Sequence, residues 1–203
     1  MHPNPIFRQE DTARALALVA ERGFGTLAVT GPDGVLLSHV PVLLEEDRLA
    51  LHLVRSNPIA RLLRDGPLAA VVAVQGPDGY ISPDWYGIDD QVPTWNYTAV
   101  HLRGPLELRP AEEMRDLLAR QSAAYEARLA PKRPWTMDKM TPEALERMLR
   151  QIVPCQMRIE TVESTFKLGQ NKSPEAREGA AGGLEAVGFG QETERLARLM
   201  REV

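Results

Sequence analysis

The segment Phe166–Lys172 carries side chains suited to binding an anion. Its ammonium and amide groups precede Ser173–Pro174, a pair typical of a helix start. Ammonium groups, amides and backbone N–H groups at a helix start are the donors of phosphate sites. A solvated turn of the same composition is the more common structure, so the segment alone leaves both interpretations open. The candidate donors are Lys167, Gln170, Asn171 and Lys172.

A second candidate site is an aromatic stretch that spans Tyr80–Tyr86 and Pro93–Thr98. It holds two of the 3 Trp and three of the 4 Tyr residues of the chain. Aromatic rings with polar edges suit a planar ligand or a subunit interface, although an ordinary barrel core would use them too. In a strand, Trp95 and Tyr97 share one face, and Thr94, Asn96 and Thr98 share the other.

Histidine and cysteine give weaker signals. His52 lies in an alternating strand, on the face opposite its leucine neighbours, and His39 lies in a second strand. A lone strand histidine is more often a hydrogen-bonded structural group than a ligand. No spacing typical of a metal site occurs, so we expect no metal. The single Cys155 permits no internal disulfide, and we expect a buried, apolar thiol.

Several function classes are disfavoured by what the sequence contains. It has neither a dinucleotide-binding glycine motif, nor a P-loop, nor a nucleophile elbow. The formal net charge of -4 and the pI of about 5.7 argue against non-specific nucleic-acid binding. The N-terminus has no signal-peptide pattern and no apolar run is long enough to span a bilayer, so we expect a cytoplasmic protein without a membrane partner.

Periodicity and turn residues predict short strands in the first half of the chain and helices mainly in the second. The first three strands should form an antiparallel meander because their connections are short. Residues 76–90 read as irregular. This pattern predicts an α+β fold around a small barrel. We expect helices at 10–22, 57–66, 110–129, 141–151 and 191–202, and strands at 24–30, 35–44, 48–54, 68–74, 92–104 and 156–163.

Several segments together resemble the PaiB-type family of FMN-binding negative transcriptional regulators. Each segment is modest alone, but their order and spacing make the resemblance strong. Two positions depart from the family pattern: Asp78 stands where the family usually has His, and Gly169 where it usually has Ser. The matching segments are Pro3–Phe7, Ser38–Leu44, His52–Pro58, Gly79–Tyr86, Val92–His101 and Phe166–Lys172.

The resemblance implies a split β-barrel like that of pyridoxamine-phosphate oxidases, with FMN held where two copies of a homodimer meet. It implies one domain over residues 1–203, with a helical insertion at about 110–151 and a helical tail at about 173–203. The flavin ring would lie among Ser38–Pro41 and Trp95–Thr98, and the phosphate would meet Arg55, Asn57, Lys167 and Lys172. The full set of expected cofactor-binding residues is Ser38, His39, Val40, Pro41, His52, Arg55, Asn57, Trp95, Asn96, Tyr97, Thr98, Lys167, Gln170, Asn171 and Lys172.

The expected function is that of an FMN-binding negative transcriptional regulator. No helix-turn-helix signature occurs, so we expect regulation through a partner or a metabolite rather than by direct operator binding. A flavin-dependent oxidoreductase similar to flavin reductases is an open alternative, since the fold does not decide function. A haem-binding split barrel is another, with His39, His52 and His101 as candidate iron ligands.

Overall fold

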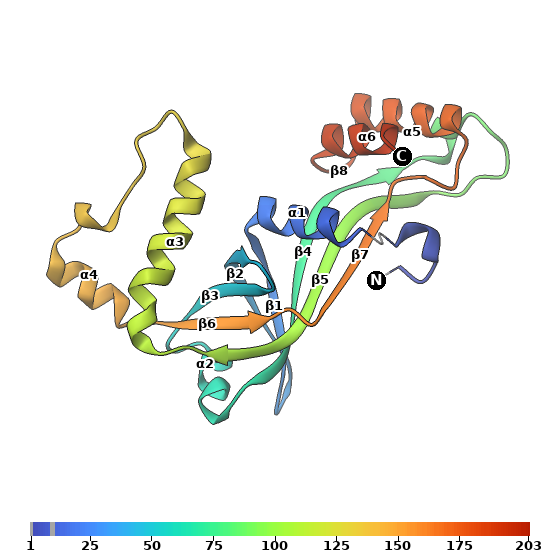
Figure 1. Cartoon of the computed structure of the whole chain (residues 1–203). Coiled ribbons are helices and arrows are strands. Elements are labelled where there is room, and N and C mark those ends of the chain that lie inside the picture. Colours follow the sequence, from blue (N-terminus) through green and yellow to red (C-terminus); the bar gives the residue numbers. More distant parts are fainter. Residues whose placement is uncertain (1, 9–10) are drawn as a thin grey trace. The chain divides into compact units, whose positions relative to one another are not determined.

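The computed structural model describes residues 2–8 and 11–203 and shows an α+β protein (Figure 1). The predicted helix at 10–22 is confirmed from Thr12 onward, while Glu10 lies outside the described residues. The helices are α1 (Thr12–Arg22), α2 (Pro58–Leu62), α3 (Met114–Glu126), α4 (Pro142–Leu149), α5 (Pro174–Val187) and α6 (Thr193–Arg201). The strands are β1 (Phe24–Gly31), β2 (Gly34–Glu45), β3 (Arg48–Val54), β4 (Leu68–Ile81), β5 (Thr94–Leu108), β6 (Ile152–Arg158), β7 (Thr161–Lys167) and β8 (Gly190–Gln191).

The chain divides into two compact units, each made of discontinuous segments. Unit 1 comprises residues 1–18, 74–101 and 162–203, and unit 2 comprises residues 19–73 and 102–161. The long strands β4 and β5 contribute residues to both units. The expectation of one domain with an insertion stays a prediction.

Unit 2 contains the predicted meander. β1 pairs antiparallel with β2, and β2 with β3, through two-residue turns at Pro32–Asp33 and Glu46–Asp47. β3 also pairs with β6, β6 with β5, and β1 with β4. Since β4 and β5 pair as well, the order of pairings β1-β2-β3-β6-β5-β4 closes on itself. A closed order of this kind is that of a small barrel.

The strands of unit 2 alternate between a buried inner face and an outer face, as the sequence pattern predicts. Along β3, Leu49, Leu51 and Leu53 are buried, while His52 points to the outer face. Burying these aliphatic side chains supplies most of the stability of such a core. Fully buried members of the unit 2 core include Leu27, Leu49, Leu51, Ile59, Leu102, Leu106 and Met157.

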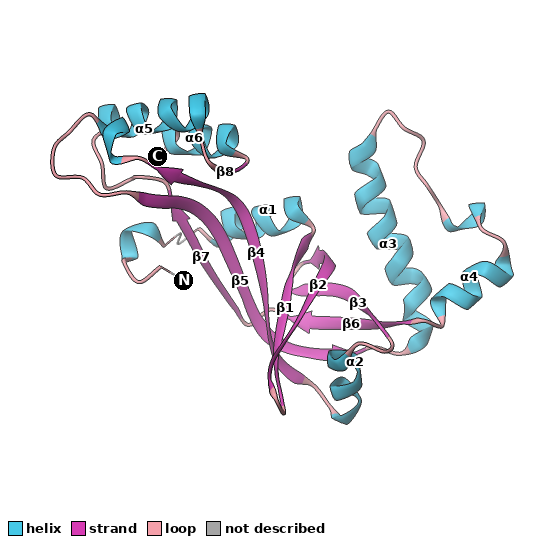
Figure 2. Cartoon of the chain, turned by 180° about the vertical axis from the view of Figure 1, so that it is seen from behind, coloured by secondary structure: helices cyan, strands magenta, loops and turns pink. Residues whose placement is uncertain are grey.

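Helix α3 covers part of the outer face of unit 2 (Figure 2). Its residues Met114 and Leu117 pack with Ala50 of β3. The Tyr125 hydroxyl lies 3.0 and 2.8 Å from the carbonyl oxygens of Gly23 and Val42. Gly23 has φ +59, and a Cβ there would lie 2.9 Å from the Tyr125 ring, so the glycine ends α1 where the tyrosine lies. These contacts fix α3 on the sheet.

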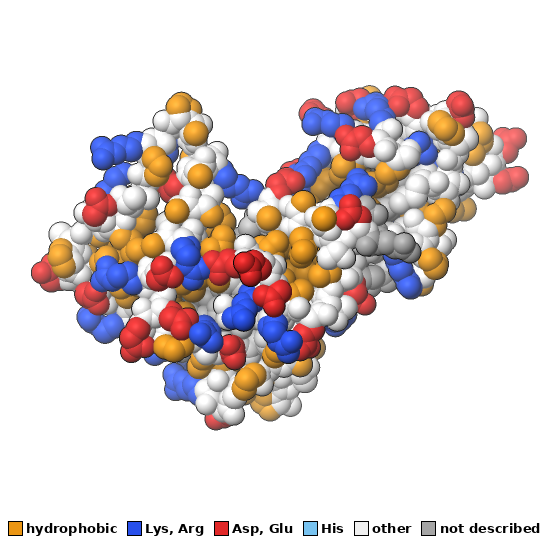
Figure 3. All heavy atoms as spheres, viewed as in Figure 1, with side chains coloured by type: hydrophobic (Ala, Val, Ile, Leu, Met, Phe, Trp, Pro, Cys, Tyr) orange, Lys and Arg blue, Asp and Glu red, His pale blue; other side chains and the backbone are white. Residues whose placement is uncertain are grey.

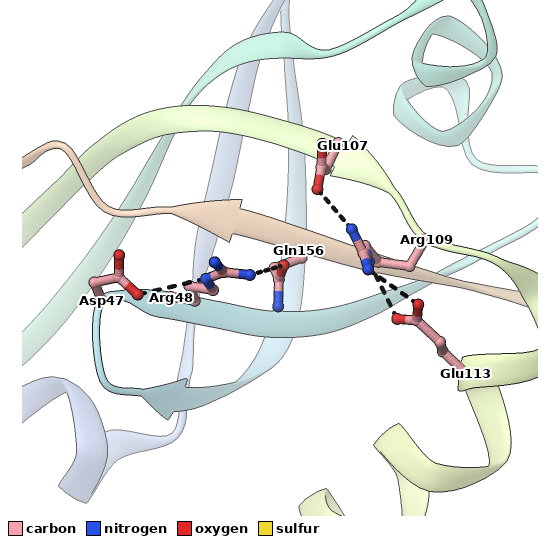
Figure 4. A network of polar contacts seen from close by, with 6 residues as sticks. All are labelled: Asp47, Arg48, Glu107, Arg109, Glu113 and Gln156. Atoms are coloured by element: carbon pink, nitrogen blue, oxygen red, sulfur yellow. Dashed lines mark hydrogen bonds and ion pairs between the residues drawn. The ribbon is translucent and has the colours of Figure 1, made fainter.

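Two small polar networks hold the edge of unit 2 from which α3 begins (Figure 4). Arg109 contacts Glu107 at 3.0 Å and Glu113 at 3.0 Å, across the corner between β5 and α3. Arg48 contacts Asp47 at 3.4 Å and the Gln156 amide oxygen at 3.1 Å, which links β3 to β6. Because half-exposed ion pairs add little stability, we read these contacts as fixing orientation rather than holding the fold together.

Unit 1 is a small sheet covered by the C-terminal helices. β7 pairs with β5, β5 with β4, and β4 with β8, where Asp78 lies opposite Gln191. Helices α5 and α6 pack against each other (Figure 2). Buried members of this core include Val74, Ile81, Val100, Leu168, Ala180, Leu184, Leu196 and Met200.

Two expectations about secondary structure are wrong. Residues 76–81, expected to be irregular, continue β4, because Asp78 and Gly79 pair with β8. The single strand expected at 156–163 is two strands, β6 and β7. Between them, the backbone N–H of Glu160 donates to Arg103, which a sequence pattern does not reveal. Within the described residues no helix is long and apolar enough to cross a membrane.

Candidate functional site

A cavity of about 290 Å³ in unit 1 brings together several of the predicted phosphate donors. We call it the lysine cavity. At about 30 Å³ for one water molecule, it has room for roughly ten groups of that size. Its lining residues are His2, Phe7, Tyr86, Asp90, Gln91, Val92, Thr94, Asn96, Lys167, Gly169, Asn171 and Lys172.

Both lysines are held by side chains of neighbouring elements. Lys167 Nζ donates to the Thr94 hydroxyl at the start of β5 and lies 5.7 Å from the centre of the Phe7 ring. Lys172 Nζ donates to the Gln91 amide oxygen and lies 5.0 Å from the centre of the Tyr86 ring. Cations over aromatic faces are stabilised without losing their charge. The cavity therefore holds two oriented ammonium groups.

The floor of the lysine cavity is polar and buried. Asn96 is 1% exposed, and its amide nitrogen donates to the Met200 sulfur at 3.5 Å. Gly169 has φ +81, and a Cβ at this glycine would lie 3.7 Å from the Asn96 amide. A serine there would have room but would adopt a backbone conformation unfavourable for L residues.

The charge of the cavity favours an anion. Two ammonium groups line it, against one carboxylate, Asp90, among the lining residues that the structure describes. Burial lowers the pKa of Lys167, because desolvation disfavours the charged amine. A bound anion would counter this cost, so the cavity and a negatively charged ligand stabilise each other.

The remaining predicted residues of unit 1 do not line the lysine cavity. Trp95 points to the other face of β5, 42% exposed, with Tyr80 and Phe189 rings at 6.3 and 5.5 Å. Tyr97 shares that face by strand alternation, half-buried. Thr98 is fully buried, and its hydroxyl finds no hydrogen-bond partner in the part of the chain that the structure describes.

Gln170 does not line the lysine cavity, and its amide forms two local hydrogen bonds. Its amide nitrogen donates to the Phe166 carbonyl at 2.6 Å, and its amide oxygen accepts from the Leu168 backbone N–H at 2.8 Å. The side chain therefore closes the turn after β7. This turn places Lys167 and Lys172 around the same cavity.

In unit 2, the predicted phosphate donors Arg55 and Asn57 are already hydrogen-bonded. The Arg55 guanidinium donates to the carbonyls of Arg150 and Ile152 at 2.9 and 3.2 Å. Asn57 caps α2 by accepting from the Ile59 N–H at 2.9 Å, and donates to the Ser38 hydroxyl at 3.1 Å. Because Asn57 caps α2, its amide is less available to a ligand.

The stretch Ser38–Pro41 divides between the two faces of β2. Val40 is buried in the core, and Ser38 shares its face, while His39 and Pro41 point outward. His39 lies 3.0 Å from the Thr26 hydroxyl and stacks beside Phe24 at 6.5 Å. The side chains of these four residues therefore divide between the two faces of β2, and their contact with a ligand stays a prediction.

His52 forms the kind of hydrogen bond that the more common interpretation of a strand histidine expects, and its part in cofactor binding stays a prediction. Its Nδ1 lies 3.1 Å from the amide oxygen of Gln121, which is 3% exposed. Burial lowers the His52 pKa, and the Gln121 hydrogen bond opposes that shift. The imidazole thus links β3 to α3.

The part of the outer face that α3 leaves uncovered forms a second hollow. From here on, the outer face means this uncovered part alone. On it, Thr26 and Ala28 of β1 lie between His39 and Leu37 of β2 and the paired residues of β4. Val35 and Leu37 are 67% and 65% exposed. The cavity here has about 570 Å³, and its lining includes Ala28, Thr30, Val35, Pro67, Ala69, Val71, Arg103, Pro105 and Glu160.

Sequence reasoning missed part of the lysine cavity. Gln91 and Asp90 lie in a loop that carries no motif, and Phe7 and His2 come from the far end of the chain. The local feature that could have drawn attention to this loop is its run of acidic and amide side chains, Asp89–Gln91, just before β5. The described residues contain no group of three or more His, Cys, Asp or Glu placed to hold a metal.

Comparison with known proteins identifies the family. Residues 1–161 match the protein family described as "Putative FMN-binding domain". The chain belongs to this family. The predicted PaiB-type resemblance and FMN cofactor are thereby confirmed, since the match covers most of the chain.

A curated relative of this FMN-binding chain is "Protease synthase and sporulation protein PAI 2" of Bacillus subtilis. The two are 31% identical over 177 residues, which is 85% of this chain and 84% of the relative. A protein of Aspergillus fumigatus described as uncharacterized is 26% identical over 216 residues, covering 82% of this chain and 83% of that protein.

Solved structures confirm the split-barrel fold. An FAD- and haem-binding protein from Mycobacterium smegmatis aligns with a TM-score of 0.59 and 17% identity, over 91% of this chain and 82% of that one. The flavocytochrome Anf3 of Azotobacter vinelandii aligns with a TM-score of 0.56 and 12% identity, over 94% of this chain and 81% of that one. At these identities the likeness concerns the fold alone.

The residues of the lysine cavity fit the phosphate end of FMN. Two ammonium groups, the Asn171 and Asn96 amides and the Thr94 hydroxyl surround one hollow. Charged donors of this kind make short, strong hydrogen bonds to phosphate oxygens. Bound FMN would supply the redox chemistry, and these residues would bind and orient it.

Proposed function

We propose that this chain is a cytoplasmic, FMN-binding regulatory protein that acts as a homodimer and holds the FMN phosphate in the lysine cavity. The observation that carries the proposal is the convergence of Lys167 and Lys172 on one polar hollow in a member of an FMN-binding family. The FMN phosphate is close to a dianion at neutral pH, so paired ammonium groups suit it.

The ring contacts expected at Ser38–Pro41 and Trp95–Thr98 stay part of this proposal. Of these residues, Asn96 is the one that lines the lysine cavity, and His39 is the one with an exposed polar edge on the outer face. Arg55, Asn57 and Gln170 are proposed to act indirectly, because their side chains hold backbone groups or one another in place.

The homodimer is proposed to form through the outer face. Exposed Phe24, Val35 and Leu37 make this an apolar sheet surface with a hollow, which is unusual on the surface of a monomer. Aliphatic and aromatic side chains free of charge are typical of the centre of a subunit interface.

The regulatory role is supported by the relative from Bacillus subtilis, whose name refers to protease synthesis and sporulation. We propose negative control of transcription through a partner or a metabolite. The formal net charge of -4 gives no basic field for a duplex. FMN would then act as a regulatory ligand rather than as the redox cofactor of a catalysed reaction.

The phosphate assignment is tested by comparing FMN with riboflavin, which lacks the phosphate. We expect Lys172→Ala to weaken FMN binding about tenfold to a hundredfold, because a charge-assisted hydrogen bond contributes about 1.5–3 kcal/mol. Riboflavin affinity should change little. Calorimetric titration measures both, with Lys139→Ala as the control. An unchanged ratio of FMN to riboflavin affinity in Lys172→Ala would place the phosphate elsewhere.

The regulatory assignment is tested with the same holoprotein. We expect FMN to bind tightly while reduced nicotinamide cofactor is consumed no faster than by free FMN. Steady oxidation of the nicotinamide with protein-bound FMN would instead establish a flavin-dependent oxidoreductase. The absorbance of the reduced nicotinamide follows this directly.

A further inference from the structure

The segment His2–Arg8 is a compact turn closed by hydrogen bonds of its own. The Asn4 side chain accepts from the Ile6 N–H at 3.1 Å and so caps the short 3-10 helix that follows it. The Arg8 guanidinium donates to the His2 carbonyl at 3.3 Å, which joins the two ends of the segment. We call this segment the N-terminal turn. These short-range bonds define its shape without help from the sheet beside it.

The N-terminal turn is attached to β7 in unit 1 (Figure 1). The His2 backbone N–H donates to Thr165 Oγ1 at 3.0 Å, and Arg8 forms an isolated β-bridge with the same residue. Lys167, which lines the lysine cavity, follows Thr165 two residues later in β7. The contacts of the turn with β7 therefore hold it next to the cavity.

The N-terminal turn has a side that faces the lysine cavity and a side that faces solvent. His2 and Phe7 line the cavity, and Phe7 is 5% exposed, with its ring centre 5.7 Å from Lys167 Nζ. The neighbouring Ile6 is 47% exposed and does not line the cavity. In the space-filling view, hydrophobic and basic side chains reach the surface around this turn (Figure 3). The turn thus forms one side of the cavity with part of its residues only.

The His2 imidazole is held in one orientation. The Asn4 backbone N–H donates to His2 Nδ1 at 3.1 Å, and the ring lies edge-on to Phe7, with ring centres 4.7 Å apart. A ring nitrogen that accepts a hydrogen bond carries no hydrogen, so the neutral imidazole carries its hydrogen on Nε2. His2 therefore brings an N–H donor to a cavity that already holds two ammonium groups.

We propose that the N-terminal turn closes the lysine cavity over the FMN phosphate, and that His2 Nε2–H donates to a phosphate oxygen. This inference rests on the proposed function, because it takes the FMN phosphate as the bound anion. Lys167 and Lys172 supply the charge, and His2 supplies a directed donor from the other end of the chain. Phe7 shields the Lys167 ammonium from bulk water, which strengthens its attraction to the phosphate.

His2→Phe tests the donor, because phenylalanine keeps an aromatic ring beside Phe7 but has no N–H. We expect FMN to bind this variant about tenfold more weakly, since a hydrogen bond to a charged group is lost, and to dissociate faster. Riboflavin, which lacks the phosphate, should bind it as it binds the wild type. Calorimetry gives the affinities, and flavin fluorescence after dilution of the loaded protein gives the dissociation rates.

Ile6→Ala is the matched control, because Ile6 belongs to the same turn but does not line the cavity. This variant should bind FMN and riboflavin as the wild type does. A loss of FMN affinity in Ile6→Ala as large as that in His2→Phe would overturn the proposal, since any disturbance of the turn would then have the same effect.

Nitrogen NMR of the imidazole groups gives a readout that the packing of the turn alone does not change. The His2 signals are assigned with His2→Phe. We expect the hydrogen of His2 on Nε2 in the unliganded protein, and a shift of the Nε2 resonance with FMN that riboflavin does not produce. Equal shifts with FMN and riboflavin would contradict a contact with the phosphate.

The variants also separate this inference from the phosphate assignment on which it rests. If Lys172→Ala lowers the ratio of FMN to riboflavin affinity and His2→Phe does not, the inference is wrong while the lysine cavity stands. If neither variant changes the ratio, the phosphate lies elsewhere and both fail. If His2→Phe weakens FMN and riboflavin equally, the turn only stabilises the fold, and the inference is again wrong.

Discussion

At the scale of single residues, burial decides what the titratable side chains can do. His52 and Cys155 are both partly or fully enclosed in unit 2, and both lose polar solvation. Lys167 also loses part of its hydration through burial, but it lines a cavity that an anion can enter. The same physical effect therefore marks two structural groups and one candidate ligand-binding group.

His52 should make stability depend on pH. Its folded-state pKa lies below the value of about 6.5 in an unfolded chain, so the unfolded state binds more protons in between. The stability it contributes is present above about pH 6.5 and is lost as the pH falls through the folded-state pKa. Urea unfolding should show a smaller loss between neutral and mildly acidic pH for His52→Gln than for the wild type. His39→Gln is the control, and equal losses in all three proteins would contradict the argument.

Cys155 should be chemically silent in the folded protein. Burial raises the pKa of its thiol to about 12, so roughly one thiol in ten thousand is ionised at pH 8. We expect alkylation by iodoacetamide to be at least about a thousandfold slower in native protein than in urea. Rapid native alkylation would show that the thiol is accessible and ionised. Mass spectrometry at timed intervals measures both rates.

At the scale of elements, the glycines of α5 let this helix approach the loop before β5. A Cβ at Gly183 would lie 2.4 Å from the Trp85 ring, and one at Gly179 would lie 2.4 Å from the Trp85 carbonyl oxygen. Tyr86, the next residue, lines the lysine cavity, and Lys172 lies just before α5. The close packing of α5 therefore helps to position the cavity.

Two neighbouring glycines of α5 should respond to alanine in opposite directions. Gly183→Ala should destabilise unit 1 by roughly 1–3 kcal/mol, because the methyl group overlaps the Trp85 ring. Gly182→Ala meets nothing within 4 Å and should stabilise the helix by about 0.5–1 kcal/mol. The changes in unfolding free energy relative to the wild type, measured in urea for the two variants, should have opposite signs. A Gly183→Ala protein as stable as the wild type would show that the contact gives way freely.

At the scale of the whole molecule, the proposed dimer depends on the exposed apolar residues of the outer face. A charge placed in an apolar interface loses its hydration, which costs several kcal/mol. We therefore expect Leu37→Asp to weaken the proposed dimer at least a hundredfold. Val187→Asp, at a residue 74% exposed in unit 1, should leave it unchanged. Sedimentation equilibrium measures both variants, and a monomeric wild type would remove the dimer from the proposal.

The sequence by itself determined most of the elements and the family. Alternation and turn residues were enough for the meander β1 to β3, because each strand pairs with its neighbour in the chain. The side-chain cap at Asn57 likewise joins residues that are close in sequence. The motif Phe166–Lys172 pointed to an anion because its chemistry is carried by one short segment.

Only the tertiary structure decided which candidates share a site. The lysine cavity needs Thr94 and Gln91, which lie 73 and 81 residues from Lys167 and Lys172 in sequence, and local pattern carries no information about such pairs. Arg55, Gln170 and His52 are polar residues in the sequence, but the fold commits each to a hydrogen bond with a distant or backbone group. Whether a polar side chain binds a ligand or holds the fold depends on what packs against it, and that is fixed only when the chain folds.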